Sequence, residues 1–152
     1  MVPQPVKTQS IIPRLDGMAR DAQMLRILGR MPPEEFAREE NFVRAQFYLR
    51  RALEGVFHIG SHILSRIPGG RVTEYKAIAI RLGDLGIVPR EYANKALRAM
   101  AGYRNRLTHF YADIKPEELQ QILSLNLDDF DKFAAAIRAL LEHPDQFGLV
   151  IE

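Results

Sequence analysis

Apolar residues recur along most of the chain at alternating steps of three and four, the spacing that places one buried face on an α-helix. The clearest run predicts a single helix from Pro33 to Ile67, about 35 residues long, with a coiled-coil-like seam. The seam consists of Phe42, Ala45, Leu49, Ala52, Val56, Ile59 and Ile63. It exceeds what a small bundle must bury, so two interpretations stay open: a core face throughout, or a face that partly contacts a second copy.

The same spacing predicts further helices over residues 15–31, 73–85, 89–111 and 126–141. Pro116 is expected to open a short helical turn, and Asn126 is expected to cap the last helix ahead of its acidic first turn. Since no segment shows the alternation of a strand, the predicted fold is all-α. We expect a four-main-helix up-and-down bundle with short extra helices.

The two ends of the chain lack this periodicity. Residues 1–13 contain three prolines and are interpreted as an N-terminal arm. Pro144 is expected to stop the last helix. The predicted organisation is therefore an arm (1–13), one helical domain (14–143) and a C-terminal tail (144–152).

Composition narrows the protein class. The 152 residues are 47% hydrophobic and 26% charged, which is typical of one soluble globular domain, and they include no cysteine. Disulfide frameworks, thiolate zinc sites and thiol nucleophiles are thereby excluded. No apolar run is long enough to span a membrane, and the first ten residues do not resemble a signal peptide, so we predict a cytoplasmic protein with no membrane partner.

Charge is unevenly distributed. Residues 117–152 carry two basic and eight acidic side chains, whereas the rest of the chain carries 19 basic and 11 acidic ones. The basic part is compatible with a polyanionic partner such as RNA, and equally with solvated helix faces.

A metal site is the weaker interpretation of two histidines on the long helix. His58 and His62 lie four residues apart, with Glu54 one turn earlier, but the string between them lacks the glutamate of the zincin motif. We interpret them as solvated or interface histidines. No metal and no cofactor are predicted.

Polar residues crowd the end of the 89–111 helix. Steps of four, three and four place Arg98, Gly102, Asn105 and His109 on one line of that helix. Gly102 costs about 1 kcal/mol relative to alanine at such a position, so another backbone or a phosphate is expected to approach this line closely.

Arginine and histidine at this helix end suit phosphodiester chemistry. Arg104 offers a permanently charged fork for phosphate oxygens, and His109 can transfer protons near neutral pH. Their spacing of five separates them by about 140° on an ideal helix, so convergence requires arginine's reach, an unwound last turn or a second subunit. On chemistry alone, a helix-capping histidine beside a surface arginine explains the same residues.

The string Arg104-Asn-Arg-Leu-Thr-His109-Phe-Tyr111 resembles the R-X4-H-X-Y signature of HepT-like toxins, all-α ribonucleases of the HEPN superfamily. The preceding long helix, the Tyr75–Leu85 segment and the Leu127–Phe130 start of the last helix resemble the same family, so the resemblance covers roughly residues 14–143.

This resemblance implies a homodimeric, metal-independent endoribonuclease toxin with RNA as substrate and an MNT-type nucleotidyltransferase as antitoxin. It implies that Arg104 and His109 are catalytic and that Tyr111 is the tyrosine that the antitoxin modifies with AMP. The residues expected to support the site or bind RNA are Asn105, Arg106, Tyr111 and Arg98. The alternative is a non-catalytic HEPN module that binds a nucleotidyltransferase or a nucleotide.

Overall fold

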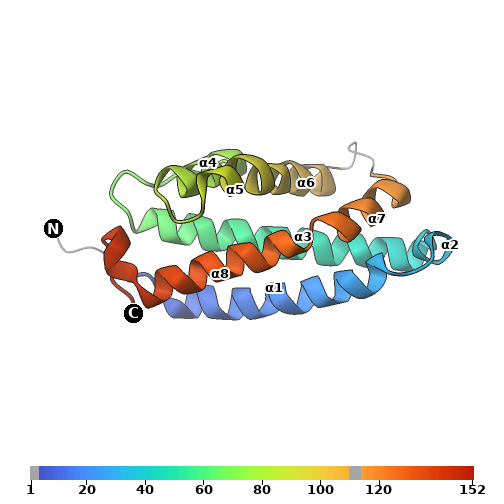
Figure 1. Cartoon of the computed structure of the whole chain (residues 1–152), viewed down its shortest axis with the longest axis horizontal. Helices are drawn as coiled ribbons and strands as arrows, with labels where there is room; N and C mark the ends of the chain where they lie inside the picture. The colour runs from blue at the N-terminus through green and yellow to red at the C-terminus, as the bar shows by residue number, and fades with distance from the viewer. Residues whose placement is uncertain (1–3, 110–113) are drawn as a thin grey trace.

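The computed structural model describes residues 4–109 and 114–152, which fold into a helical bundle (Figure 1). The elements are α1 (Thr8–Gly29), α2 (Pro33–Phe36), α3 (Glu39–Ser65), α4 (Tyr75–Asp84), α5 (Arg90–Tyr92), η1 (Ala93–Leu97), α6 (Arg98–Thr108), α7 (Pro116–Leu125), α8 (Asp128–Glu142) and η2 (Pro144–Phe147). Because α5, η1 and α6 follow one another without a gap, they form one long helix. The prediction of an all-α bundle with four main helices and short extra ones is confirmed.

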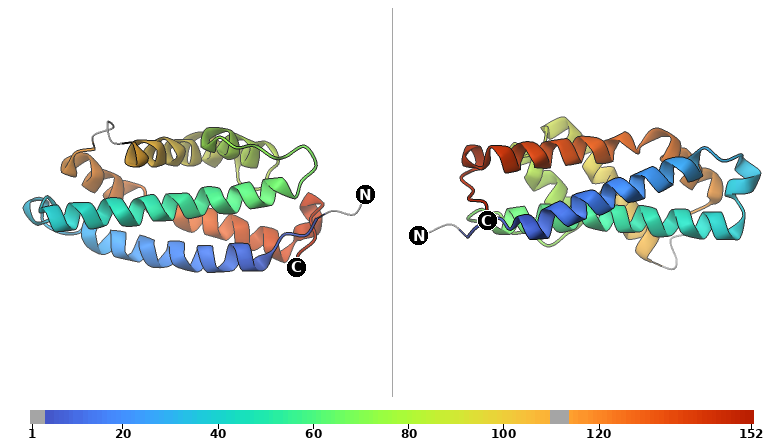
Figure 2. Two further views of the ribbon diagram at one scale, coloured as in Figure 1. Left: turned by 180° about the vertical axis from the view of Figure 1, so that it is seen from behind. Right: turned by 90° about the horizontal axis from the view of Figure 1, so that it is seen from below.

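The long helices alternate in direction, and α3 lies in the interior of the bundle. α1 runs between α3 and α8 when the molecule is seen from below (Figure 2). α4, α5 and α6 cover the opposite side of α3 (Figure 1). The helix that carries most of the predicted site residues therefore packs on one face of α3, and α1 packs on another.

The apolar seam of α3 forms the centre of the core. Ala45, Leu49, Ala52, Val56, Ile59 and Ile63 are each no more than 2% exposed within this single chain. At roughly 25 cal/mol per Å² of buried apolar surface, this seam is a main source of the bundle's stability. These six positions confirm the interpretation of the seam as core. Phe42, the first seam residue, is only partly buried, so the suggestion that part of the seam contacts a second copy stays a prediction.

Two glycines bring α4 unusually close to its neighbours. A Cβ atom on Gly60 would lie 2.9 Å from a methyl group of Ile78, and one on Gly83 would lie 2.6 Å from the Cβ of Ala93. No real side chain tolerates such distances, so both positions require glycine for packing. α4 is thereby held between α3 and η1.

The first helix begins earlier than predicted. α1 starts at Thr8 rather than near Leu15, so residues 8–13 are helical and do not belong to an arm. Pro13 lies inside the helix on its exposed side, where water can satisfy the carbonyl group left without its N–H partner. Burial of Ile11 on the opposite side outweighs the proline's cost.

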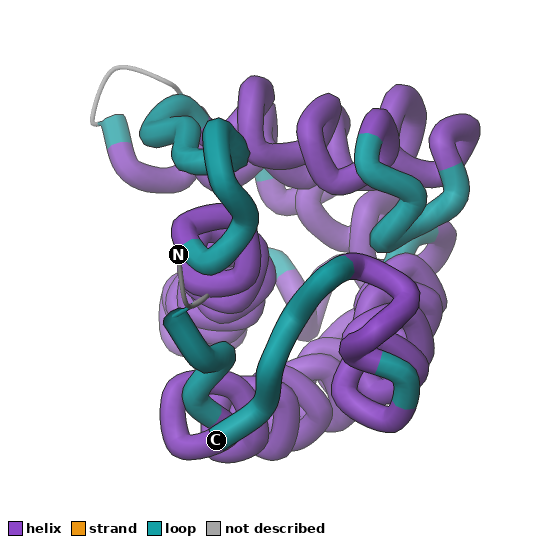
Figure 3. Tube along the Cα trace, turned by 90° about the vertical axis from the view of Figure 1, so that its left-hand side faces the viewer, coloured by secondary structure: helices purple, strands orange, loops and turns teal. Residues whose placement is uncertain are grey.

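The two ends of the described chain are joined. Val6 is fully buried and forms a parallel bridge with Ile151. Its N–H donates to the Val150 carbonyl at 2.7 Å, and its carbonyl accepts from the Glu152 N–H at 2.8 Å. These bonds hold residues 4–7 and the final residues against each other at the end of the bundle seen in Figure 3.

The predicted helix over residues 33–67 is interrupted. α2 ends at Phe36, and Arg38 has an extended backbone with φ −60° and ψ 139° before α3 begins. The Asn41 amide donates to the Glu35 carbonyl at 2.9 Å and stabilises this break. The sequence marks this break only by the absence of seam residues between Phe36 and Phe42.

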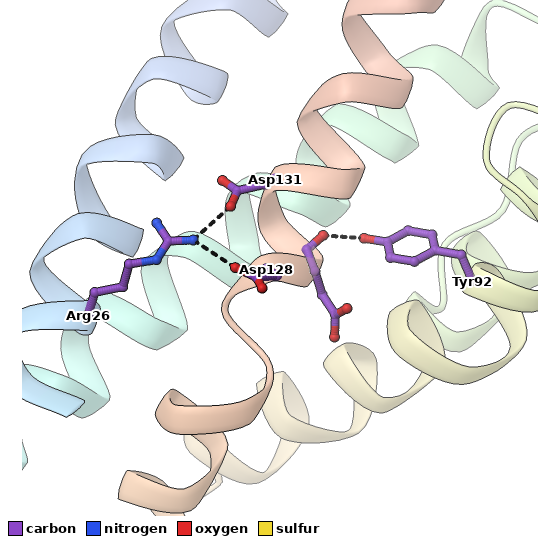
Figure 4. Close-up of polar contacts among 5 residues, drawn as sticks. Arg26, Tyr92, Asp128 and Asp131 are labelled. Carbon is purple, nitrogen blue, oxygen red and sulfur yellow. Dashed lines mark hydrogen bonds and ion pairs between the residues drawn. The ribbon is translucent and has the colours of Figure 1, made fainter. Parts of the chain in front are cut away.

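Two further differences concern the C-terminal half. The segment opened by Pro116 is a ten-residue helix rather than a short turn. Leu127, not Asn126, occupies the N-cap of α8, and no side chain caps that end. The predicted acidic first turn is confirmed, and two of its carboxylates also bind another helix: the Arg26 Nη2 of α1 lies 2.7 Å from Asp131 and 3.4 Å from Asp128 (Figure 4).

An ion pair ties α6 to α7. The Arg106 guanidinium donates to both Glu118 carboxylate oxygens, at 2.6 and 2.8 Å. This hydrogen bonding lowers the pKa of Glu118 below its ordinary value of 4.5 and raises the pKa of Arg106.

Among the helices that the structure describes, none has the length and apolar character needed to span a membrane.

We expect the substitution Val6→Ala to lower the free energy of unfolding by about 2 kcal/mol, because it removes buried methyl groups from a fully enclosed site. Val150→Ala is the matched control, since Val150 is 49% exposed and its truncation should change stability by no more than about 0.5 kcal/mol. Chemical denaturation of the three proteins measures both values. Equal stability of the two variants would show that burial of the Val6 side chain contributes nothing.

A second prediction concerns pH. Because the folded-state pKa of Glu118 is lowered, its stabilisation is complete above about pH 4.5 and disappears as the pH falls through the folded-state value. Since both partners are more than a third exposed, Glu118→Gln should cost no more than about 1 kcal/mol at pH 7. The cost should shrink towards zero in acid. Glu117→Gln removes a neighbouring first-turn carboxylate without an arginine partner, so a loss as large in that variant would contradict the ion-pair explanation.

Candidate active site

The Arg104 guanidinium of α6 lies on a stack of two aromatic rings, one from α4 and one from α3. Its central carbon is 4.3 Å from the centroid of the Tyr75 ring at the start of α4. Tyr75 in turn stacks on Phe57 of α3, with centroids 4.9 Å apart and planes inclined by 7°. Phe57 is buried, so the stack is anchored in the core. A cation above an aromatic face gains about 0.5–2 kcal/mol, which restricts the guanidinium to one orientation.

One carboxylate approaches this guanidinium loosely. The Arg104 Nη2 lies 3.9 Å from the Glu54 Oε1 of α3, at the outer limit of an ion pair. The Arg104 Nε is buried and donates to no acceptor among the described residues. Leaving a buried donor unsatisfied costs about 1–3 kcal/mol, and such atoms in native structures call for an explanation such as a functional role.

Asn105 shares an open depression with Arg104. The walls of this depression come from the start of α4, the residues just before it, and α6. They are Thr73, Glu74, Tyr75, Lys76, Arg104 and Asn105. It therefore holds two predicted site residues, one further cation and the aromatic ring that supports Arg104. A ligand of the size of a phosphate group would meet Arg104 from this side.

His109 terminates α6 instead of continuing it. Its backbone is extended, with φ −95° and ψ 128°, and its N–H donates to the Asn105 carbonyl at 3.3 Å. This is the ordinary helical bond to the residue four positions earlier, so α6 stays wound up to His109 and the separation of about 140° from Arg104 is kept. The unwound last turn that was one predicted route to convergence is therefore not seen here, and His109 is exposed.

The predicted line of polar residues begins at Arg98, which is exposed at the start of α6, directly after the π-helical turn η1. Among the described residues, a Cβ on Gly102 would meet no atom within 4 Å. No backbone of the described part of the chain therefore approaches Gly102 as expected, and no described residue blocks a ligand or a second molecule there.

Arg106 does not line this depression with Arg104. Arg106 forms the bidentate pair with Glu118 described above, which ties α6 to α7. Tyr111 lies outside the described residues, so its assignment as the modified tyrosine stays a prediction.

The two histidines of α3 show no metal arrangement. The His62 Nε2 accepts a hydrogen bond from the Lys7 backbone N–H at 3.0 Å. Burial and the nearby charges of Arg66, Arg14 and Lys7 lower the pKa of His62, which favours the neutral acceptor form. His58 is exposed one turn earlier. Across residues 4–109 and 114–152, no three His, Asp or Glu side chains are grouped as metal ligands.

Sequence reasoning missed the residues that orient Arg104. Tyr75 and Phe57 lie 29 and 47 positions before it, and nothing in their local pattern marks a shared stack. Glu54 was considered only as a companion of the histidines, yet it faces Arg104. The one available signal was the motif itself, since a catalytic arginine generally needs support from neighbouring groups.

Comparisons with known proteins identify the family of this chain. The family model for HepT-like ribonucleases matches residues 19–137. A tRNA nuclease HepT from Aphanizomenon flos-aquae is 32% identical over 94 residues, which are 61% of this chain. The aligned region spans 63% of that relative's length.

Similar folds occur in solved toxin–antitoxin complexes. A chain of a mutant MntA–HpeT complex superposes with a TM-score of 0.75 at 19% identity, over 86% of this protein and 98% of that chain. A structure of the tri-AMPylated Shewanella oneidensis HEPN toxin with its MNT antitoxin gives 0.76 at 19%, over 85% and 96%. A toxin–antitoxin with AMP-PNP gives 0.77 at 18%, over 86% and 98%. These likenesses establish the fold, and since the family model covers most of the chain, the protein belongs to the HepT-like ribonuclease family.

Proposed function

We propose that this protein is the toxin of a toxin–antitoxin pair and acts as a metal-independent endoribonuclease. The observation that carries the proposal is the fixed Arg104 guanidinium, which is stacked on Tyr75, held only loosely by Glu54 and open towards a hollow. The family match and the tRNA nuclease among the relatives support RNA as the substrate. The cytoplasm, where RNA is abundant, is the proposed location.

In the proposed reaction, RNA supplies its own nucleophile. The 2′-hydroxyl attacks the adjacent phosphorus, and the bond from phosphorus to the 5′-oxygen breaks, which leaves a 2′,3′-cyclic phosphate and a free 5′-hydroxyl. His109 exchanges the proton at one of these oxygens, either as base or as acid. Arg104 stabilises the negative charge that gathers on the phosphate oxygens. Asn105, beside Arg104, is proposed to contact the same phosphate, and Arg98 to bind RNA further along α6.

A homodimer is part of the proposal. Arg104 and His109 lie five positions apart, which is about 140° around a helix that stays wound up to His109, so the two residues of one active site are proposed to come from two subunits. Gly102 and the exposed start of α6 offer an open surface near this cleft. Arg106 would then act through the bond with Glu118 that ties α6 to α7 rather than by binding RNA itself.

The proposed antitoxin is an MNT-type nucleotidyltransferase that transfers AMP from ATP to Tyr111 and releases pyrophosphate. The AMPylated HEPN toxin bound to its MNT antitoxin, among the similar folds, supports this assignment. An added phosphodiester brings negative charge and bulk to the motif that would receive RNA.

The catalytic assignment is tested with labelled RNA in excess EDTA. We expect His109→Ala and Arg104→Ala each to reduce cleavage by about 10²–10⁴-fold, as for loss of a proton-transfer or charge-stabilising group. His143→Ala and Arg138→Ala, at exposed positions on and after α8, are the matched controls and should cleave like the parent. The products should end in 2′,3′-cyclic phosphate. Full activity of either site variant would overturn the assignment, and a folded parent that binds its antitoxin but cleaves no RNA would favour a non-catalytic binding module.

The modification is tested by mass spectrometry after incubation with the antitoxin and ATP. We expect AMP on Tyr111 and loss of RNA cleavage in the modified protein. Tyr111→Phe should stay unmodified and continue to cleave, whereas Tyr103→Phe, which keeps the motif tyrosine, should be modified and silenced. Modification of the Tyr111→Phe protein would identify a different acceptor.

A further inference from the structure

A second cavity, of about 390 Å³, lies between α1 and α3. Its walls carry cationic side chains from both helices, and its floor includes two glycines. The residues that line it include Arg14, Gly17, Arg20, Arg51, Gly55 and His58. The proposed reaction uses none of them. We call this cavity the α1–α3 groove.

The charge of the groove is predominantly positive where it is exposed. Asp21, one of its two acidic residues, is only 2% exposed and accepts both hydrogen bonds of a bidentate contact from Arg51, at 2.9 and 2.5 Å. That carboxylate is therefore neutralised inside the wall. Arg14 donates through one nitrogen to the Ser10 carbonyl at 2.8 Å, and Arg20 is exposed along the same face of α1.

The two glycines have no packing explanation within the chain. Both lie in helix interiors, where glycine is less favourable than alanine. A Cβ on Gly55 would meet nothing within 4 Å, and one on Gly17 would meet only the Arg20 Nη2, at 3.8 Å. Gly60 and Gly83, by contrast, are required by close helix contacts. The bare backbone of the α1–α3 groove therefore favours close approach of an external ligand.

The groove continues to the candidate active site at one end and to an aromatic ring at the other. Glu54 lines the groove, and its carboxylate is 3.9 Å from Arg104. In the other direction along α3, Phe47 is 45% exposed, and the Arg51 guanidinium lies 4.8 Å from its ring centroid. A cationic groove bordered by an exposed aromatic ring is the usual arrangement for binding single-stranded nucleic acid without sequence preference.

We propose that the α1–α3 groove binds the sugar–phosphate backbone of single-stranded RNA beside the cleavage site, with Arg14 and Arg20 as phosphate ligands and Phe47 as a stacking surface. The choice of RNA as ligand rests on the proposed function. Arg51 is a positioning residue, since its guanidinium is occupied by Asp21 and supports the wall of the groove.

The test measures binding of a labelled 2′-O-methyl RNA oligonucleotide by fluorescence anisotropy over a range of salt concentrations. This probe lacks the nucleophilic hydroxyl, so binding is read without cleavage. We expect the double variant Arg14→Ala/Arg20→Ala to bind about tenfold more weakly or worse. Its plot of log Kd against log salt should be shallower by about 1.4, which is roughly 0.7 for each lost single-strand phosphate contact.

The matched control is Arg30→Ala/Arg138→Ala, which removes the same charge from exposed positions outside the groove. It should keep the parent's affinity and salt slope. If the groove variant binds like the parent, or if the parent does not bind the probe, the proposal is overturned. A changed oligomeric mass of the groove variant in light scattering, with unchanged RNA binding, would identify the groove as a protein interface instead.

Gly55→Gln provides a variant that cannot be dismissed as unfolded. The added Cβ meets no described atom within 4 Å, and glutamine favours the helix over glycine, so the melting temperature should rise by roughly 2–4 °C. RNA binding should nevertheless weaken, because the side chain fills the groove. A more stable protein with unchanged RNA affinity would contradict the proposal.

Failure of the proposed function looks different from failure of this inference. If the parent protein binds the uncleavable probe through Arg14 and Arg20 but never cleaves RNA, the groove proposal is supported and the proposed ribonuclease function is contradicted. If cleavage depends on His109 but RNA binding does not depend on Arg14 and Arg20, the ribonuclease function is supported and the groove proposal is contradicted.

Discussion

The close crossing of α3 and α4 at Gly60 determines where Arg104 points. Because no side chain separates the helices there, α4 begins directly above Phe57, and the Tyr75 ring stacks flat on it. Arg104 then lies on the outer face of Tyr75. A rigid guanidinium matters for phosphoryl chemistry because a charge already oriented towards the developing negative charge needs no reorganisation during the reaction. The core of the bundle thus orients a surface cation.

Four arginines of this protein differ in how closely a carboxylate approaches them. Arg26, Arg51 and Arg106 have carboxylate partners within 2.5–2.7 Å and join one helix to another. Arg104 has an aromatic ring below it and a carboxylate no closer than 3.9 Å. A phosphate competes poorly for the first group, whose hydrogen-bonding capacity is already used, and well for the second. Arg104 and Arg106, two positions apart in one motif, therefore have different partners, which the motif alone does not reveal.

Local periodicity was sufficient to predict the fold class, because the buried faces of α3, α6 and α8 follow helical spacing closely. It did not reveal the break at Arg38, because the polar run before Phe42 contains no proline or glycine to mark a helix end. It also missed the helical state of residues 8–13, where tertiary burial of Ile11 outweighs Pro13. Arg104 and His109 were found through their motif, whereas Tyr75, Phe57 and Glu54 depend on helix crossings between distant parts of the chain.

The bridge between the first and last described residues has a kinetic meaning. Thr8 donates to the carbonyl of Glu152, 144 positions away, which is close to the largest separation that the chain permits. Closing so long a loop has a high entropic cost before any contact compensates it, so we expect this pairing to form after the folding transition state. Interactions that form late slow unfolding without speeding folding. The joined ends would therefore govern the lifetime of the native bundle rather than the rate of its assembly.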